Sequence, residues 1–389
     1  MNPLICMIFC SFICLTESKV FFNYHHPSSK TQRLVYVGTY TEGTSSEGIY
    51  AYQLNSKTGQ LNKLGLAAKT SNPSYFIIHP NTRYLYAVNE LEQYEGKSAG
   101  AVSSFEINKR SGTLQYLNSQ TSLGAAPCYI STDKEGKNVL VANYNGGNVA
   151  VLPINKKSGQ LSPSSSFQQH TGSSVNKDRQ NEPHAHSIRL DQQNKFALSA
   201  DLGTDKIYIY SYNSKNGTIT PNSQSPFGTS TPGSGPRHLI FSPNNKQIYV
   251  MNELTSNIDV FDYDQKLGNM KLVQTVSTLP NNLTLKSNSG AEILLHPNGK
   301  YLYSSNRGHN SIAIFTVEKK SGKLNLIGNE STQGQTPRNF NIDPTGQYMI
   351  VANQDSNNLV IFRINSRSGK LNSTGQIVEL EKPVCIKFL

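Results

Sequence analysis

Short runs of alternating apolar and polar residues, rich in β-branched and aromatic side chains, fill most of the chain. This alternation is typical of β-strands that bury one face, and clusters of Gly, Pro, Asn and Ser separate the runs as turns do. No segment keeps a 3.6-residue apolar period, which argues against a helical solenoid. The pattern therefore predicts an all-β protein.

One turn motif recurs along the chain: a basic residue, a second residue and Gly, followed two positions later by an apolar residue. Its glycines are Gly59, Gly112, Gly159, Gly217, Gly268, Gly322 and Gly369. Such a motif forms a tight turn between antiparallel strands. Its seven copies, spaced about 52 residues apart, indicate an internal repeat.

A second motif has the same spacing and consists of an apolar strand, a turn and an aromatic-rich strand that ends in Asn. Clear copies read YFIIHPNTRYLYAVNE, HLIFSPNNKQIYVMNE and NFNIDPTGQYMIVANQ, and a degenerate copy starts at His186. Each repeat thus contains two hairpins. Four strands per repeat of this length are typical of a propeller blade.

The two ends of the chain supply complementary parts of one repeat. The first strand-like segment, residues 34–40, matches a second strand, and the last, residues 383–389, matches a lone first strand. We predict a seven-bladed β-propeller over residues 34–389, with four antiparallel strands per blade and the C-terminal strand completing the N-terminal blade. This closure would remove open sheet edges.

The N-terminal residues 1–33 differ from the repeats. Residues 4–15 form an apolar run that is too short to span a bilayer and has the length of a signal-peptide core, although no basic residue precedes it. We predict a signal-like leader with a flexible connector, and export to the periplasm or the medium. The alternative is a cytoplasmic protein with an unprocessed tail. We expect no integral membrane domain.

The formal net charge of +11 suggests either an anionic ligand or a solvated basic surface. No dense Lys/Arg cluster accompanies this charge, so we expect no nucleic-acid partner. A closed propeller needs no second subunit for stability, and we expect a monomer.

Strand direction predicts where a functional site lies. In each blade the start of the innermost strand and the end of the second strand meet on one face of the ring. The Asn that ends the second strand is expected to cap a turn. The next residue varies between blades (Glu90, Tyr144, Glu253, Arg307, Gln354), as a functional mouth requires.

Several ionisable residues fall at this mouth. We select His184, His186, Glu253 and Arg307 as catalytic candidates, and Arg237, His238, Arg338, Glu90 and Asn252 as substrate-binding candidates. A carboxylate with imidazoles can activate water, and guanidiniums can bind an anion or stabilise an oxyanion. The alternative is a polar, water-filled channel with balancing charges.

His184 and His186 lie two apart, so in a regular strand they would face the same way and could hold a metal. A third ligand is not obvious, with Asp201, Glu253 and His238 as the only candidates. We therefore expect a proton-transfer or hydrogen-bonding role, with no metal and no cofactor. No Walker loop, nucleophile elbow or dinucleotide fingerprint stands in a suitable context.

Several longer strings resemble a known family. They are VYVGTYTEG with GIYAY, NEPHAHS, GPRHLIFSPNNKQIYVMNEL, SNRGHNSIAIF and TPRNFNIDPTGQYMIVANQDSN. The chain resembles the seven-bladed propeller lactonases, which comprise bacterial 6-phosphogluconolactonases and fungal carboxy-cis,cis-muconate cyclases. The resemblance implies an active site of one His (His184 or His186), Arg237, Glu253 and Arg307.

The resemblance further implies metal-independent hydrolysis of a sugar-derived lactone that carries a carboxylate or phosphate. Glu253, assisted by one of the two histidines, would activate water or shuttle a proton. Arg237 and Arg307 would bind the substrate anion and stabilise the oxyanion. The alternatives are a lactonising cyclase of the muconate type and a non-catalytic exported propeller that binds a glycan or a protein.

Overall fold

The computed structural model describes residues 31–223, 227–228, 231–280, 283, 285 and 287–389. Nearly all of the predicted leader, residues 1–30, therefore lies outside the described residues. The first described strand, β1, starts at Gln32, which pairs with Asn55. No described segment forms a helix long and apolar enough to cross a membrane.

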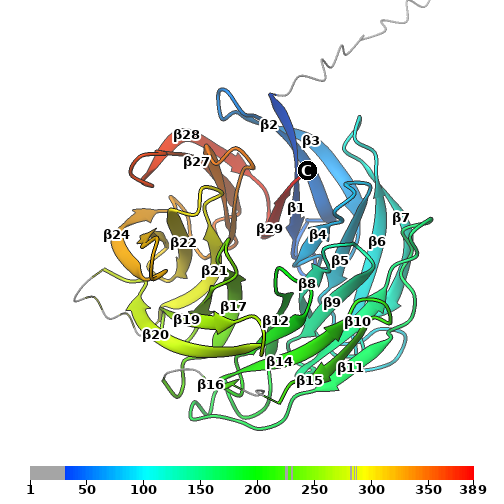
Figure 1. The fold of residues 1–389 in the computed structure, drawn as a ribbon. Helices are drawn as coiled ribbons and strands as arrows, with labels where there is room; N and C mark the ends of the chain where they lie inside the picture. The colour runs from blue at the N-terminus through cyan, green and yellow to red at the C-terminus, as the bar shows by residue number, and fades with distance from the viewer. Residues whose placement is uncertain (1–30, 224–226, 229–230, 281–282, 284, 286) are drawn as a thin grey trace, which may run out of the picture. The chain divides into compact units, whose positions relative to one another are not determined.

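The described residues form seven antiparallel sheets arranged around a common centre (Figure 1). The first sheet contains β29 (Pro383–Phe388), β1 (Gln32–Thr39), β2 (Gly48–Asn55) and β3 (Leu61–Lys69). The second contains β4 (Phe76–Ile78), β5 (Tyr84–Asn89), β6 (Ala101–Ile107) and β7 (Leu114–Thr121). The third contains β8 (Pro127–Thr132), β9 (Asn138–Asn143), β10 (Asn148–Pro153) and β11 (Ser166–Gln169).

The remaining sheets repeat this order. The fourth contains β12 (Ala185–Leu190), β13 (Phe196–Asp201), β14 (Lys206–Asn213) and β15 (Thr218–Pro221), with the short β16 (Phe227–Gly228) also pairing with β14. The fifth contains β17 (Pro236–Phe241), β18 (Gln247–Asn252), β19 (Asn257–Asp264) and β20 (Asn269–Ser277). The sixth contains β21 (Ser289–Leu295), β22 (Tyr301–Arg307), β23 (Ser311–Val317) and β24 (Leu324–Ser331). The seventh contains β25 (Pro337–Ile342), β26 (Tyr348–Asn353), β27 (Asn358–Ile364) and β28 (Leu371–Glu379).

The two ends of the described unit share one sheet. β29 pairs antiparallel with β1, and the register runs from Val35 opposite Phe388 to Thr39 opposite Pro383. The C-terminal strand therefore supplies the innermost strand of the N-terminal blade. The predicted all-β fold, its seven blades and the closure of its ring are confirmed.

The second strands are the most apolar parts of the blades because both of their faces are covered. Every residue of β5, β9, β13, β18 and β26 is buried. Strands buried on both faces read as nearly continuous apolar runs. The same second strands end in Asn or, in β13, in Asp201, which brings polar side chains to one end of the ring.

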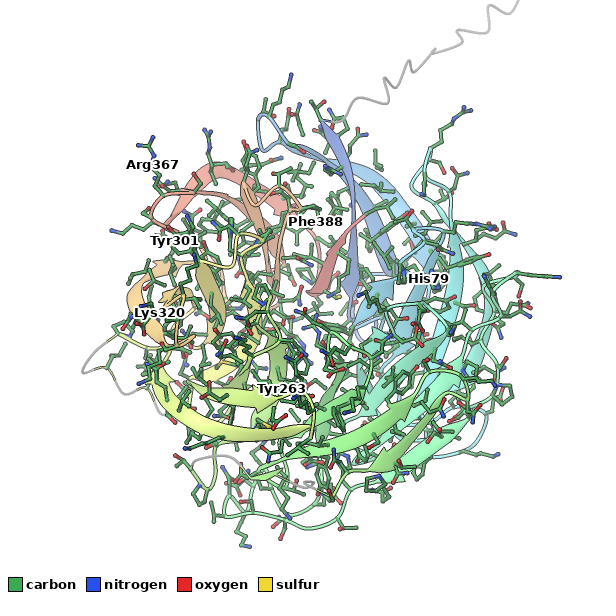
Figure 2. The ribbon with its side chains drawn as sticks, viewed as in Figure 1. His79, Tyr263, Tyr301, Lys320, Arg367 and Phe388 are labelled. Atoms are coloured by element: carbon green, nitrogen blue, oxygen red, sulfur yellow. The ribbon has the colours of Figure 1, made fainter. Side chains whose placement is uncertain are left out.

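Tyrosine hydroxyls join neighbouring blades. The Tyr84 hydroxyl in β5 donates a hydrogen bond to the carbonyl of Lys157, in the turn motif of the next blade, over 3.1 Å. Tyr301 and Arg367 form an equivalent pair, and both are labelled in Figure 2. The recurring turn motif therefore both reverses the chain and ties each of these turns to the adjacent blade.

Gly159 allows this contact and provides a test of it. Its φ is +73°, and a Cβ there would lie 2.3 Å from the Tyr84 ring. Gly159→Ala should lower the free energy of unfolding by about 2 to 4 kcal/mol, because backbone strain and overpacking add. Gly375 is the matched control, since its φ is +80° but nothing lies within 4 Å of its added Cβ.

Urea unfolding of both variants separates backbone strain from overpacking. Gly375→Ala should lower the free energy of unfolding by only about 1 kcal/mol, because only the left-handed backbone is strained there. Equal losses for the two variants would contradict a role for the Tyr84 contact.

Candidate active site

A β-bulge recurs near the start of the innermost strand. In six of the seven blades the register between the first two strands shifts at this point. The residues left without a ladder partner include Cys128, His186, Arg237 and Arg338. Bulges bend a strand and re-aim a side chain, and they are common beside active sites. The bulge explains how one strand position contributes different chemistry in each blade.

The backbone just before these strands is strained. Ala126, Thr336 and Lys382 have φ values of 51°, 57° and 46°, and each directly precedes the Pro that begins a first strand. Non-glycine residues in this region are kept only where the surrounding structure demands it, often at functional sites. The strain fixes where each first strand enters the mouth.

Glu253 is the centre of the group. It follows β18 and is 4% exposed. Its Oε2 accepts a hydrogen bond from Arg237 Nε over 2.9 Å and forms an ion pair with Arg307 Nη2 at 2.9 Å. Its Oε1 accepts one from Arg179 Nη2 over 2.8 Å. Three guanidiniums therefore surround one buried carboxylate.

The charges of this group are fixed over the physiological range. Burial alone would raise the pKa of Glu253, but the neighbouring cations, above all Arg307 and Arg237, hold it well below its usual range. Burial, together with the nearby Arg307, lowers the pKa of Arg237 to about 10. Glu253 is therefore a carboxylate and Arg237 a cation at neutral pH, and the group keeps an excess of positive charge.

His238 and Glu292 lie behind Arg237. Glu292 Oε1 accepts a hydrogen bond from His238 Nδ1 over 2.9 Å, which leaves His238 Nε2 to accept from Arg237 Nη1 at 3.3 Å. Burial lowers the pKa of His238 to about 4. Burial would raise the pKa of Glu292, but His238 lowers it to about 2. A neutral imidazole thus orients Arg237.

His186 borders Glu253 directly. Its Nε2 lies 4.0 Å from Glu253 Oε2, and its Nδ1 lies 3.5 Å from Cys128 Sγ. Burial, reinforced by Arg237, holds the pKa of His186 well below its usual range. His186 is consequently neutral at pH 7, and its Nε2 faces the Glu253 carboxylate.

His184 has a different environment. Its ring stacks on Tyr144 with the centroids 4.4 Å apart, and its Nδ1 donates to the Tyr144 carbonyl over 3.0 Å. The bulge between Ala185 and Ser187 breaks the regular alternation on which the shared-metal alternative depends. No three His, Cys, Asp or Glu side chains of the described residues are arranged to hold a metal.

Arg338 and Glu90 lie at another side of the mouth and are linked by Tyr40. The Arg338 guanidinium lies over the Tyr40 ring, 5.3 Å from its centroid, and the Tyr40 hydroxyl reaches both Glu90 oxygens at 3.1 Å. No hydrogen bond or ion pair to a described residue engages that guanidinium. Its donors are therefore available to a ligand.

Asn252 does not join the group. Its side-chain amide is fully buried and donates to Asn257 Oδ1 over 2.7 Å and to Asp259 Oδ2 over 2.8 Å. These bonds occupy both amide hydrogens in the turn between β18 and β19. We therefore leave Asn252 out of the proposed substrate-binding residues.

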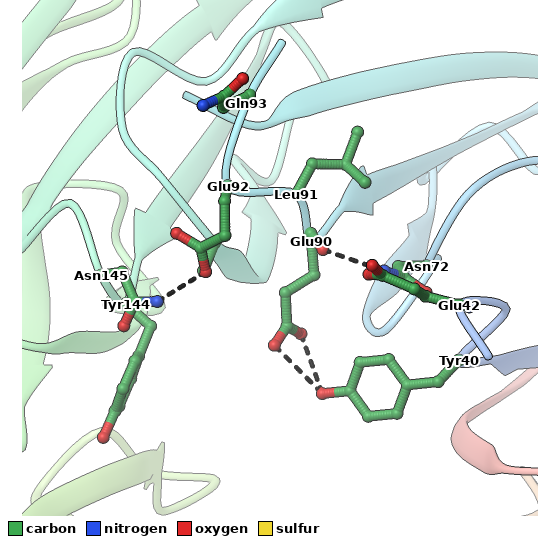
Figure 3. Close-up of a pocket in the computed structure, with 10 residues that line it drawn as sticks. Tyr40, Glu42, Asn72, Glu90, Leu91, Glu92, Gln93, Tyr144 and Asn145 are labelled. Atoms are coloured by element: carbon green, nitrogen blue, oxygen red, sulfur yellow. Dashed lines mark hydrogen bonds between the residues drawn. The ribbon is translucent and has the colours of Figure 1, made fainter. Parts of the chain in front are cut away.

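A pocket of about 820 Å³ opens beside these side chains (Figure 3). Tyr40, Glu90 and Tyr144 are among the residues that line it, and Figure 3 shows the Tyr40–Glu90 hydrogen bonds on one wall. Glu253 is not a lining residue. The pocket meets the charged group through Tyr144, whose hydroxyl is held by Arg179 at 3.0 Å, and through Tyr40 beneath Arg338.

Comparison with known proteins identifies the family. The family model "Lactonase, 7-bladed beta-propeller" matches residues 34–388. The chain belongs to the seven-bladed β-propeller lactonase family. The predicted family and the predicted lactone-hydrolysing enzyme are confirmed.

Individual relatives agree with this family. The 6-phosphogluconolactonase of Bacillus subtilis is 37% identical over 359 residues, covering 92% of this chain and 99% of that protein. A 6-phosphogluconolactonase of Formosa agariphila is 35% identical, covering 79% of this chain and 86% of that protein. The periplasmic gluconolactonase of Pseudomonas aeruginosa has a similar structure, with a TM-score of 0.86, 34% identity and coverage of 92% and 99%.

Sequence reasoning did not select three residues that contact the selected ones in the structure. Arg179 lies in a connection between blades, and Tyr40 and Glu292 lie next to the selected strand-end positions without standing out. For Glu292 the sequence did contain a signal, because selected residues of other blades directly follow the Pro that begins the first strand. Glu292 occupies the comparable position after Gly290-Ala291, where the register also shifts.

The buried histidines predict how stability depends on pH. The folded-state pKa values of His186 and His238 lie below the unfolded value of about 6.5, so below that pH the unfolded chain binds protons that the folded lactonase does not. The free energy of unfolding should fall by up to about 1.4 kcal/mol per pH unit for each histidine as pH drops from 6.5. Urea titrations at pH 6.5 and 5.0 measure this slope.

His238→Gln removes one of the two buried histidines. The free energy of unfolding should then fall less steeply as the pH drops, by about the contribution of one histidine. An unchanged slope would contradict a neutral, buried His238.

Proposed function

We propose that the protein hydrolyses a sugar-derived lactone carrying an anionic group, with 6-phosphogluconolactone as the leading candidate. One observation carries this proposal: the buried Glu253 carboxylate lies among more guanidiniums than it can neutralise, beside an open pocket. Such a site favours a substrate anion and the negative charge that develops when an acyl carbon is attacked. The pocket volume is in the range of small-molecule sites.

Water activation involves His186 and Glu253. Their facing atoms are 4.0 Å apart, so one water oxygen can hydrogen-bond to both. Guanidiniums already hold both oxygens of Glu253, whereas His186 is neutral and its Nε2 forms no hydrogen bond to a described residue. We assign Glu253 to orienting the water and stabilising the imidazolium, and His186 to accepting the proton.

The attacked carbonyl oxygen needs donors that are not already engaged. Arg307 Nε is buried without a partner, and the Arg338 guanidinium has no hydrogen bond, within the part of the chain that the structure describes. We assign both to the tetrahedral oxyanion. Collapse of that intermediate breaks the ring C–O bond, the His186 imidazolium protonates the leaving alkoxide, and a hydroxy acid is released.

Substituting each histidine in turn tests this assignment. His186→Gln should lower kcat for 6-phosphogluconolactone by roughly 10²- to 10⁴-fold, as loss of general-base catalysis does. His184→Gln should cost less than tenfold, because its ring holds Tyr144 through stacking and one hydrogen bond. Initial rates on 6-phosphogluconolactone and δ-gluconolactone, with spontaneous hydrolysis subtracted, measure both effects.

Two outcomes would contradict the proposal. A larger loss for His184→Gln would transfer the proton-acceptor role to that residue. Wild-type rates no faster than the background on either lactone would overturn lactone hydrolysis of these substrates and favour a lactonising cyclase or a glycan- or protein-binding propeller.

We also propose that the N-terminal apolar run directs export and that the protein acts as a monomer without nucleic acid. The run at residues 4–15 and the similarity to a periplasmic gluconolactonase support export. N-terminal sequencing of the protein from its own cells should find a mature chain that begins after the apolar run. An intact Met1 would instead favour the cytoplasm.

A further inference from the structure

Arg179 is a third guanidinium at Glu253 that comes from outside the propeller strands. It lies between β11 and β12, and its Nη2 donates to Glu253 Oε1 over 2.8 Å and to the Tyr144 hydroxyl over 3.0 Å. Its side chain is 41% exposed, compared with 3% for Arg237 and 15% for Arg307. Arg179 therefore occupies the rim of the cationic group.

The connection that carries Arg179 is fixed to the propeller. Gln180 is fully buried, and its Nε2 donates to the Leu202 carbonyl over 2.8 Å. Ser174 hydrogen-bonds to the Gln180 carbonyl over 2.8 Å and to Asp205 Oδ2 over 2.6 Å. Arg179 is consequently held in position before any ligand arrives, which lowers the entropic cost of binding.

The two deeper guanidiniums are less exposed and are also bonded to the backbone. Arg237 also donates to the Ala291 carbonyl, and Arg307 to the Gly290 carbonyl, each over 2.8 Å. Arg179 uses only Nη2, so Nε and Nη1 have no partner among the described residues. A partly exposed guanidinium with these N–H groups free can donate charge-assisted hydrogen bonds to a phosphate.

We infer that Arg179 is a specificity residue that binds the anionic group remote from the lactone carbonyl, such as the phosphate of a phosphorylated sugar lactone. This inference rests on the proposed lactone hydrolysis. A phosphate is strongly hydrated, so a partly exposed cation binds it at a lower desolvation cost than a buried one. Glu253 stays held by Arg237 and Arg307 when Arg179 engages the ligand.

Tyr144 connects this residue to the pocket. It lines the pocket and its hydroxyl accepts from Arg179, so Tyr144 links the pocket to the Arg179 guanidinium. Removing the Tyr144 hydroxyl leaves the positive charge of Arg179 in place but holds its guanidinium less firmly. Tyr144→Phe should therefore weaken phosphate binding less than loss of the guanidinium does.

The experiment compares kcat and KM for 6-phosphogluconolactone and δ-gluconolactone in the full-length protein. Arg179→Gln should raise KM for the phosphorylated lactone roughly 10- to 100-fold, the range of a charged hydrogen bond, with kcat within about threefold. Its kcat/KM for δ-gluconolactone should fall much less, because Arg237 and Arg307 still hold Glu253. Arg179→Lys should recover part of the loss, because a point charge lacks the guanidinium fork. Lys177→Gln, an exposed neighbour in the same connection, is the matched control.

The outcomes separate this inference from the function on which it rests. An equal loss of kcat/KM on both lactones would overturn the inference and show that Arg179 acts only by holding Glu253. A wild type with the same KM for both lactones would also overturn it, leaving lactone hydrolysis intact. A wild type inactive on both would overturn the proposed function itself. Equal midpoints of thermal unfolding for the wild type and Arg179→Lys would show that a change in folding does not explain the kinetic differences.

Discussion

The pairing of β29 with β1 is the constraint on which the propeller depends. Each sheet covers its second strand only when a blade lies on either side, and the fully buried second strands show that this condition is met. Without β29 the first blade would expose an unpaired edge and lack its innermost strand. Closure therefore stabilises every blade and also fixes the ring on which side chains from distant parts of the sequence meet.

The bulge at the start of the innermost strands changes this scaffold into a reactive site. A regular ladder would alternate side chains between the two faces of each sheet. The shift frees one residue per strand, and this residue is His186, Arg237 or Arg338 in different blades. The same bulge, repeated by the fold, thus presents an imidazole, a carboxylate-binding cation and a free cation to the same space.

The sequence was sufficient for the architecture, because turn motifs and strand ends determine register, and register determines which residues share a face. It correctly placed Glu253, Arg237 and Arg307 together. It could not show that three guanidiniums keep Glu253 ionised, nor separate His184 from His186, since the bulge between them breaks the alternation. Arg179 was missed because its role depends on a folded connection rather than on a strand end, and Asn252 was selected although its amide is used inside a turn.

The excess of guanidiniums around Glu253 also affects the end of the catalytic cycle. Opening a lactone ring creates a carboxylate, so the product carries one more negative charge than the substrate. In the proposed reaction the cations assigned to the oxyanion therefore attract the product more strongly than the substrate. Product affinity then opposes turnover, and the partly exposed rim at Arg179 is the place where water can compete for the departing anion.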